Sequence, residues 1–227
     1  MIHDLGVIIA AGGSSLRYGE KDKLLEELRG MPVFLHSIRN FLPVVTPGNM
    51  VIAVRQDALA TYRELAEKFF PQASLCWVPG GRTRVDSVKN ALDRLPMTCG
   101  LVAIHDAARP LATADLLVKV AERAAVSGGA IAAGKVADSL KLADENGFIL
   151  SPVQRESVYY AETPQIFDLQ KYRAACDALG GENIPTDDAE IMRLAGFPVE
   201  LVESGQLNIK LTSPDDLAKI ERCLPGN

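Results

Sequence analysis

The sequence contains few of the residues that bind transition metals or form disulfide bonds. Its 227 residues include four cysteines, and its three histidines are scattered. No Cys-x-x-Cys pair occurs, and no histidine is placed to complete a zinc site. We therefore expect reduced thiols, and any metal should be a hard cation held by carboxylate and phosphate oxygens. The cysteines are Cys76, Cys99, Cys176 and Cys223.

Positive charge and long hydrophobic runs are also scarce. The formal net charge is −5, so no overall positive field favours nucleic acid or an anionic membrane. The first apolar run, Leu5–Ala11, is too short to span a bilayer, and no basic segment of a signal peptide precedes it. We expect a cytoplasmic protein that binds neither nucleic acid nor membrane. Any phosphate chemistry must then use a local cluster of basic residues.

Short apolar runs alternate with helix-period segments along the chain. This alternation predicts βαβ units, and therefore an α/β fold with a mostly parallel sheet flanked by helices. No linker or internal repeat divides the sequence, so we expect residues 1–227 to form one domain. The strand candidates are apolar enough to be covered on both faces. They are Gly6–Ala10, Met50–Val54, Leu75–Val78, Leu101–Ile104, Ala130–Ala133 and Val199–Val202.

Helices are expected between these strands. Pro32 stands at a first helical position, and Asp86 or Ser87 can cap the helix that follows the third strand. Thr113 begins a further helix, which should end at a pair of glycines that allow a left-handed cap. Ser213, followed by a proline and two acids, indicates the start of the last helix.

The segment Asp138–Glu162 departs from this rhythm. Polar and apolar residues alternate in it, and Glu145-Asn146-Gly147 provides a turn. We interpret it as a protruding antiparallel arm. A two-stranded ribbon is marginally stable alone, so a second copy of the chain is the simplest packing partner. The alternative is a hairpin folded back on its own domain.

A glycine-rich segment with basic residues follows the first strand. Residues 10–19 read Ala-Ala-Gly-Gly-Ser-Ser-Leu-Arg-Tyr-Gly, and Lys21 and Lys23 come next. Small residues let backbone N–H groups approach an anion, and nearby cations neutralise it, so the segment predicts a cradle for a triphosphate. It fits neither the Walker A spacing nor the dinucleotide-binding spacing. A plain tight turn is the alternative, and the basic residues favour phosphate binding.

A second glycine turn, residues 79–88, reads Pro-Gly-Gly-Arg-Thr-Arg-Val-Asp-Ser-Val. It follows a predicted strand, and ligands of open α/β sheets bind beyond the carboxyl ends of the strands. The turn is therefore placed to bind a base or ribose. A capped loop with two solvated arginines explains the pattern equally well.

A third group of residues, 104–110, follows another strand and reads Ile-His-Asp-Ala-Ala-Arg-Pro. Asp106 can hold Mg²⁺ between phosphate oxygens, and Arg109 can bind a phosphate with both of its terminal nitrogens. An ion pair between these two residues is the alternative. We interpret His105 as structural, because a phosphate monoester is already an anionic nucleophile and needs no general base.

Four further groups are weak when taken singly. Solvated ribbon charges, a turn, a helix cap and an edge-strand lysine are their plain interpretations. The groups are Ser139, Lys141 and Arg155; Thr163-Pro164-Gln165; Thr186-Asp187-Asp188; and Asn208-Ile209-Lys210, which we place on a last strand.

Taken together, these motifs resemble the 2-C-methyl-D-erythritol 4-phosphate (MEP) cytidylyltransferase family. The resemblance runs from about Val7 to Leu224 and rests on AGGSSLRYG…DK, GG.TR.DSV, HDAARP, the DS.K arm, ETPQIF, TDDAEI and NIKLT, in that order. The combination of HDAARP, TPQ and NIK is specific. It implies a Rossmann-like domain, a β-arm exchanged in a homodimer, CTP and MEP as substrates, and Mg²⁺.

The resemblance also implies roles for individual residues. Arg17 and Lys23 match the basic pair that stabilises charge on the α-phosphate, and Lys210 is assigned to a phosphate of CTP or MEP. The expected CTP contacts are Ala10, Ala11, Gly12, Gly13, Ser14, Ser15, Gly81, Arg84 and Ser87. The expected MEP contacts are Asp106, which is also the magnesium ligand, Arg109, Ser139, Arg155 and Thr163, with Ser139 and Arg155 presented by the partner's arm.

The sequence departs from the family pattern in a few places. Ser15 replaces a common glycine, Ser139 a frequent threonine and Arg82 a frequent acid, and the spacing from Arg17 to Lys23 is one residue short. These differences concern loop detail rather than the class of reaction. The nearest alternative is a ribitol-5-phosphate cytidylyltransferase. More distant alternatives are an NAD-dependent dehydrogenase and a non-catalytic nucleotide-binding regulator. The sequence lacks the glycine motif that such a dehydrogenase uses to bind its dinucleotide.

Overall fold

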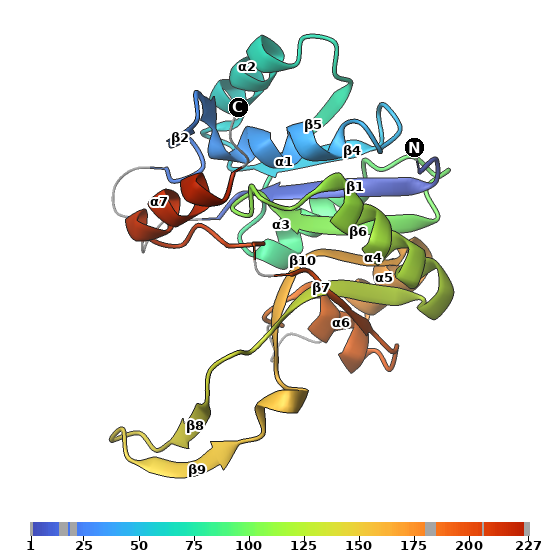
Figure 1. Cartoon of the computed structure of the whole chain (residues 1–227). Coiled ribbons are helices and arrows are strands. Elements are labelled where there is room, and N and C mark those ends of the chain that lie inside the picture. The colour runs from blue at the N-terminus through green and yellow to red at the C-terminus, as the bar shows by residue number, and fades with distance from the viewer. Residues whose placement is uncertain (1, 14–17, 19–21, 180–184, 206, 225–227) are drawn as a thin grey trace.

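A computed structural model describes residues 2–13, 18, 22–179, 185–205 and 207–224 (Figure 1). Its centre is a seven-stranded sheet with the order β11-β7-β10-β6-β1-β4-β5. All of these strands run parallel except β10, which runs antiparallel to both of its neighbours. The predicted α/β fold with a mostly parallel sheet is confirmed. The strands are β1 (Leu5–Ala11), β4 (Met50–Val54), β5 (Leu75–Pro79), β6 (Leu101–Asp106), β7 (Gly129–Lys135), β10 (Tyr159–Asp168) and β11 (Glu200–Glu203).

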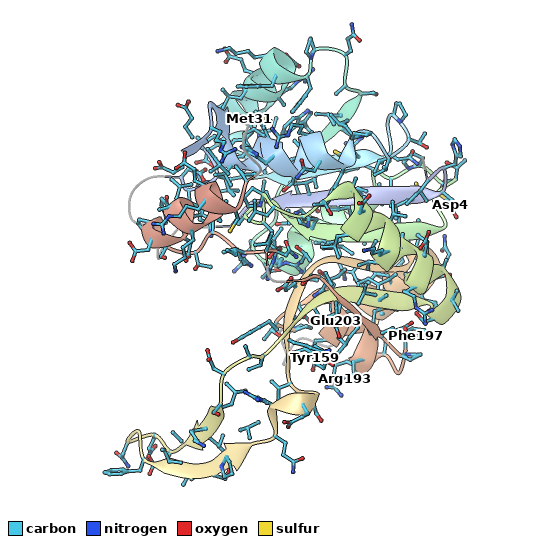
Figure 2. The ribbon with its side chains drawn as sticks, viewed as in Figure 1. Asp4, Met31, Tyr159, Arg193, Phe197 and Glu203 are labelled. Atoms are coloured by element: carbon cyan, nitrogen blue, oxygen red, sulfur yellow. The ribbon has the colours of Figure 1, made fainter. Side chains whose placement is uncertain are left out.

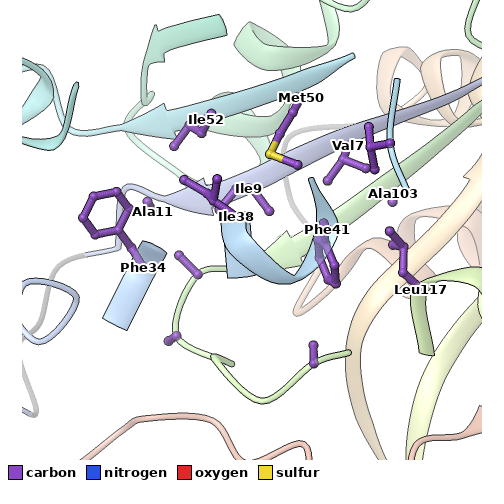
Figure 3. Packing of buried hydrophobic residues seen from close by; sticks show 14 of the residues in the cluster. Val7, Ile9, Ala11, Phe34, Ile38, Phe41, Met50, Ile52, Ala103 and Leu117 are labelled. Atoms are coloured by element: carbon purple, nitrogen blue, oxygen red, sulfur yellow. The ribbon is translucent and has the colours of Figure 1, made fainter. Parts of the chain in front are cut away.

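The central strands are buried on both faces because their apolar runs are continuous. Along β1, Val7 and Ile9 pack on one face of the sheet and Ile8 packs on the other. Figure 3 shows Val7 and Ile9 beside Ile38 and Phe41, which come from the helix that follows the first glycine-rich segment. The sheet therefore separates two hydrophobic clusters.

Helices cover both faces and complete three layers (Figure 1). The helices packed on the face of Val7 are α1 (Val33–Phe41), α2 (Leu59–Phe69), α4 (Ala114–Ser127) and α7 (Pro214–Cys223). Those on the face of Ile8 are α3 (Arg84–Leu92), α5 (Leu169–Asp177) and α6 (Asp188–Leu194). A short ribbon of β2 (Glu27–Leu28) and β3 (Met31–Pro32) precedes α1. No helix in the described part of the chain is long and apolar enough to cross a membrane.

The helix starts agree with the sequence in two cases and differ in two. Thr113 caps α4, and Ser213 caps α7 within a capping box. The expected cap at Asp86 or Ser87 is wrong, because Thr83 caps α3 and Asp86 is the third residue of that helix. The Asp86 carboxylate accepts from the Thr83 N–H. Pro32 is likewise the cap of α1 rather than its first residue.

Strand β10 was not predicted. The sequence predicts that the arm ends at Glu162, with a turn as the plain interpretation of Thr163-Pro164-Gln165, but Tyr159–Asp168 form one ten-residue strand. Its pairing with β7 shifts register between Ala161 and Gln165, and the Thr163–Pro164 peptide bond is cis. An irregularity of this kind accommodates a proline within a sheet, so the proline did not mark a turn.

Two expectations about the end of the chain are also wrong. Residues Asn208–Lys210 form no strand. The chain here is held to the domain by isolated hydrogen bonds, such as the one from the Leu211 N–H to the Ala108 carbonyl. Strand β11 is not covered on both faces, because it is the edge of the sheet and Leu201 is 46% exposed.

The protruding arm is confirmed. Strands β8 (Leu140–Ala143) and β9 (Ile149–Val153) form an antiparallel hairpin that extends away from the domain (Figure 1), so the folded-back alternative is wrong. Gly147 in its turn has φ +85°, which favours glycine. Figure 2 shows the side chains of the arm standing clear of the rest of the chain.

Candidate active site

A cleft of about 360 Å³ lies at the carboxyl ends of β1 and β6 and beside the two glycine turns. Residues far apart in the sequence line it: Ala10, Gly12, Gly13, Lys23, Leu24, Gly81, Arg82, Thr83, Arg84, Ser87, Asp106, Ala108, Lys210 and Thr212. Two other cavities, of about 350 and 620 Å³, have mostly apolar linings elsewhere on the protein. The predicted phosphate- and nucleotide-binding motifs gather in the 360 Å³ cleft, which we take as the candidate active site.

The second glycine turn is built around the Ser87 hydroxyl. This hydroxyl accepts from the Gly81 N–H at 2.9 Å and donates to the Thr83 carbonyl at 2.9 Å. A Cβ added at Gly81 would lie 2.2 Å from the Asp86 Cβ, so only glycine fits there. Ser87 therefore shapes the turn while lining the cleft, and base recognition by this turn stays a prediction.

Four charged side chains form a continuous network at the cleft. The Lys210 Nζ lies 2.5 Å from Asp106 Oδ2, and the Arg84 Nη2 lies 3.4 Å from Asp106 Oδ1. The Arg84 Nη1 lies 2.6 Å from Asp188 Oδ2, and the Asp188 side chain is fully buried. Arg84 thus bridges two carboxylates, of which one faces the cleft and the other lies behind it.

The network sets the protonation states of its members. Burial on its own would raise the pKa of Asp106, but the cations of Arg84 and Lys210 outweigh it and hold that pKa well below its ordinary value. Burial raises the pKa of Asp188, whereas Arg84 and the Tyr172 hydroxyl, 2.5 Å away, favour the carboxylate. Burial on its own would lower the pKa of Arg84, but the carboxylates of Asp188 and Asp106 together outweigh it and raise that pKa, so Arg84 stays charged.

Asp106 is the carboxylate that could hold a metal at this cleft. The described residues contain no group of three His, Cys, Asp or Glu side chains arranged around a metal site. A magnesium ion here would therefore take Asp106 as a protein ligand and complete its shell with phosphate oxygens and water, which suits Mg²⁺ chemistry. Magnesium binding at Asp106 stays a prediction.

Lys23 reaches the cleft from the loop that precedes β2. Its ammonium donates to the Leu211 carbonyl at 2.8 Å, and the side chain lines the same cleft as Lys210 and Arg84. Three predicted residues of the first glycine-rich segment, Ser14, Ser15 and Arg17, lie outside the described residues. Of the remaining predicted CTP contacts, Ala11 is buried in β1 and is not among the described lining residues.

Two predicted MEP contacts lie behind the cleft wall. The Thr163 hydroxyl accepts from the Asp106 N–H at 3.1 Å, and Arg109 donates to the carbonyls of Asn208 and Ala161 at 2.6 and 3.4 Å. Both residues are buried, and neither is among the described lining residues. They support the backbone on which Asp106 and the segment of Lys210 lie. Their contact with substrate stays a prediction.

His105 occupies the position expected of a structural residue. It is fully buried; its Nε2 faces the Arg109 carbonyl at 3.2 Å, and its Nδ1 accepts from the Thr163 hydroxyl at 3.1 Å. This arrangement assigns the proton to Nε2. Burial lowers the pKa of His105 to about 4, so the imidazole is neutral at physiological pH.

The predicted arm residues do not join the cleft of their own chain. Ser139 and Arg155 are exposed beside the hairpin, and Arg155 donates to the Ala137 carbonyl. Sequence reasoning also missed the support that Asp188 and Tyr172 give to Arg84. Asp188 was considered only as part of a helix start, and nothing in the sequence pairs it with an arginine 104 positions earlier.

Comparisons with known proteins agree on one family. The family model of 2-C-methyl-D-erythritol 4-phosphate cytidylyltransferase matches residues 5–225. The enzyme of that name from Dictyoglomus thermophilum is 34% identical over 225 residues, which cover 97% of this chain and 96% of the relative. The one from Shouchella clausii is 35% identical over 219 residues, covering 96% and 95%.

A solved structure extends the agreement to the fold. The crystal structure of 4-diphosphocytidyl-2C-methyl-D-erythritol synthase from Anaerococcus prevotii matches with a TM-score of 0.83 at 26% identity and covers 96% of each chain. The match includes nearly all of the elements that position the cleft. This chain belongs to the 2-C-methyl-D-erythritol 4-phosphate cytidylyltransferase family of nucleotidyltransferases.

Proposed function

We propose that this protein transfers CMP from CTP to MEP, giving 4-diphosphocytidyl-2-C-methyl-D-erythritol and pyrophosphate in non-mevalonate isoprenoid biosynthesis. The carrying observation is that one cleft gathers both glycine turns and the side chains of Lys23, Lys210 and Asp106 in a chain that matches the family along almost its whole length. We further propose a cytoplasmic location, where CTP is available.

The reaction needs little covalent chemistry from the protein. A phosphate oxygen of MEP attacks the α-phosphorus of CTP in line, the bond to the bridging oxygen breaks, and pyrophosphate leaves. Charge spreads over the α-phosphoryl oxygens meanwhile, so fixed cations and correct positioning supply the catalysis. We assign Lys23 to this charge and Lys210 to a substrate phosphate. Arg17, by its position in the family motif, shares the role of Lys23.

Asp106 would hold Mg²⁺, which neutralises triphosphate charge when it is bound. The carboxylate is ionised, because its two cationic neighbours keep its pKa low. It pairs with Lys210 at 2.5 Å. An incoming phosphate competes for that ammonium, and its binding would free one carboxylate oxygen. Asp106 and Lys210 would therefore exchange partners when substrates bind.

We also propose that two copies of the chain pair through the arm. Its apolar side chains are unusually exposed, with Phe148 at 70%, Ile149 at 67% and Leu150 at 62%. A monomer would leave this surface in water, whereas a second copy would bury it. The same pairing would carry Ser139 and Arg155 toward the cleft of the partner.

The decisive experiment is a pyrophosphate-release assay with each of the four nucleoside triphosphates against MEP and ribitol 5-phosphate. Only CTP with MEP should give turnover, because acceptors in the glycine turns can bind the cytosine amino group whereas uracil presents an acceptor there. Reactions that contain the nucleoside triphosphate but neither MEP nor ribitol 5-phosphate serve as controls. Comparable turnover with UTP, or preference for ribitol 5-phosphate, would contradict the proposal.

A further inference from the structure

A buried tyrosine holds the loop that carries Lys23. The Tyr62 hydroxyl, from α2, donates to Asp22 Oδ2 at 2.9 Å. The other oxygen of that carboxylate, Oδ1, accepts from the Leu24 N–H at 3.1 Å. Asp22 therefore binds the core on one side and closes a turn around Lys23 on the other. We call the contact between Tyr62 and Asp22 the latch.

The latch is fixed at its inner end. Tyr62 is fully buried, and its ring packs on Phe34 with the ring centroids 4.4 Å apart. Burial, and then the Asp22 carboxylate, raise the pKa of Tyr62 far above the working range, so the hydroxyl remains a donor. A buried hydroxyl is costly unless it is hydrogen-bonded, and phenylalanine would fill the same space without that cost. The hydroxyl is therefore explained by what it holds.

The outer end of the latch leads directly to the cleft. A hydrogen bond from the Leu25 N–H to the Asp22 carbonyl closes the turn, and one from the Phe34 N–H of α1 to the Leu24 carbonyl ties the turn to the domain. The Lys23 side chain leaves this turn toward the cleft and reaches the Leu211 carbonyl at 2.8 Å. With both the turn and the far contact fixed, the ammonium has little freedom to move.

We propose that Tyr62 and Asp22 are positioning residues that hold Lys23 where charge develops on the α-phosphate. The inference rests on the proposed function of Lys23 and adds the two residues on which its placement depends. Lysine has a flexible four-carbon stem, so its contribution to a transition state depends on how well its backbone is anchored. Neither Tyr62 nor Asp22 contacts the cleft among the described lining residues, so both act through Lys23.

The test compares Tyr62→Phe and Asp22→Ala in steady-state pyrophosphate release. Displacing Lys23 should lower kcat by about tenfold in each variant and change KM for CTP by less than about twofold, because the loss is confined to the transition state. The double variant should be no slower than either single variant, since both changes open the same latch. Arg63→Ala, an exposed change at the next position of α2, is the matched control and should behave as wild type.

A second comparison separates positioning from general stability. In a Lys23→Ala background, Tyr62→Phe should cause no further fall in kcat, because the group that it positions is gone. A kcat for Tyr62→Phe within about twofold of wild type, or an equal fall with and without Lys23, would overturn the inference. If Tyr62→Phe does not fold, Asp22→Ala at the half-buried end decides by the same criteria. Failure of the proposed function would instead appear in the wild-type protein, as absent turnover of CTP with MEP.

Discussion

The ion pair between Arg84 and Asp188 permits a sharp test of the network behind the cleft. Asp188 begins α6, its side chain is fully buried, and its oxygens lie 2.6 Å from Arg84 Nη1 and 2.5 Å from the Tyr172 hydroxyl. Asp188→Asn keeps the shape of the side chain and removes its charge. Arg84 then faces a neutral amide at its inner end.

The cost follows from the burial of the pair. Removing one partner of a buried ion pair costs about 3–5 kcal/mol, because the remaining charge is left uncompensated. Arg84 keeps Asp106 at 3.4 Å, and its side chain is 30% exposed, which places this variant at the lower end of the range. A loss of about 3 kcal/mol in a domain of this size lowers Tm by about 6–12 °C.

Thermal melts of Asp188→Asn and Glu190→Gln measure this difference directly. Glu190 lies on the same helix and pairs with Arg193 at 2.7 Å, but both side chains are solvent-accessible. The control should therefore change stability by no more than about 0.5 kcal/mol. If Asp188→Asn melted together with the control, the pair would not hold Arg84 and our account of the network would be wrong.

Three further predictions concern the cleft, the buried histidine and the arm. Lys23→Ala should lower kcat by about 10²-fold or more with a far smaller change in KM for CTP, while its thermal melt stays near that of wild type; unchanged kcat would remove Lys23 from the mechanism. His105 has a folded-state pKa of about 4, below its unfolded value of about 6.5, so the unfolded chain binds more protons as pH falls. Urea titrations should show that His105 lowers the free energy of unfolding by about 2 kcal/mol as the pH falls from about 7.5 to about 5, and His105→Gln should remove this loss. If the free energy of unfolding of that variant depended on pH as in the wild type, the pKa shift of His105 would be contradicted. Phe148→Asp in the arm should convert a dimer to a monomer in light scattering, and a monomeric wild type would refute arm-mediated pairing.

Most of the sheet could be predicted because buried parallel strands appear in the sequence as uninterrupted apolar runs. The candidate at Met50–Val54 matches its strand at both ends, and the others differ by a few residues. Strand β10 was not predicted because its sequence is not an uninterrupted apolar run. Thr163, Pro164 and Gln165 have turn-like composition, and the strand continues through them only because the residues on either side of Thr163 and Pro164 pair with neighbouring strands.

The cleft could be predicted where its residues follow strands, and not where they depend on contacts between distant elements. Asp106 and the glycine turns lie at strand ends, and in a parallel sheet these ends meet at one edge. Asp188 and Tyr62 carry no such signal. Each lies in a helix, and its partner becomes a neighbour only after the helix packs on the sheet.

Tyr62 and Asp188 show how the side chains of a charged cleft can be held rigidly although the cleft itself is open to solvent. Tyr62 anchors the turn of Lys23 from the hydrophobic cluster on one face of the sheet, and Tyr172 binds the carboxylate that holds Arg84 from the cluster on the other. In both cases a tyrosine hydroxyl donates to an aspartate, which fixes the position of the carboxylate. Long cationic side chains lose rotamer entropy when they bind phosphate. Anchoring them beforehand through the core moves that cost from the reaction to the folding of the chain, where two hydrophobic clusters can offset it.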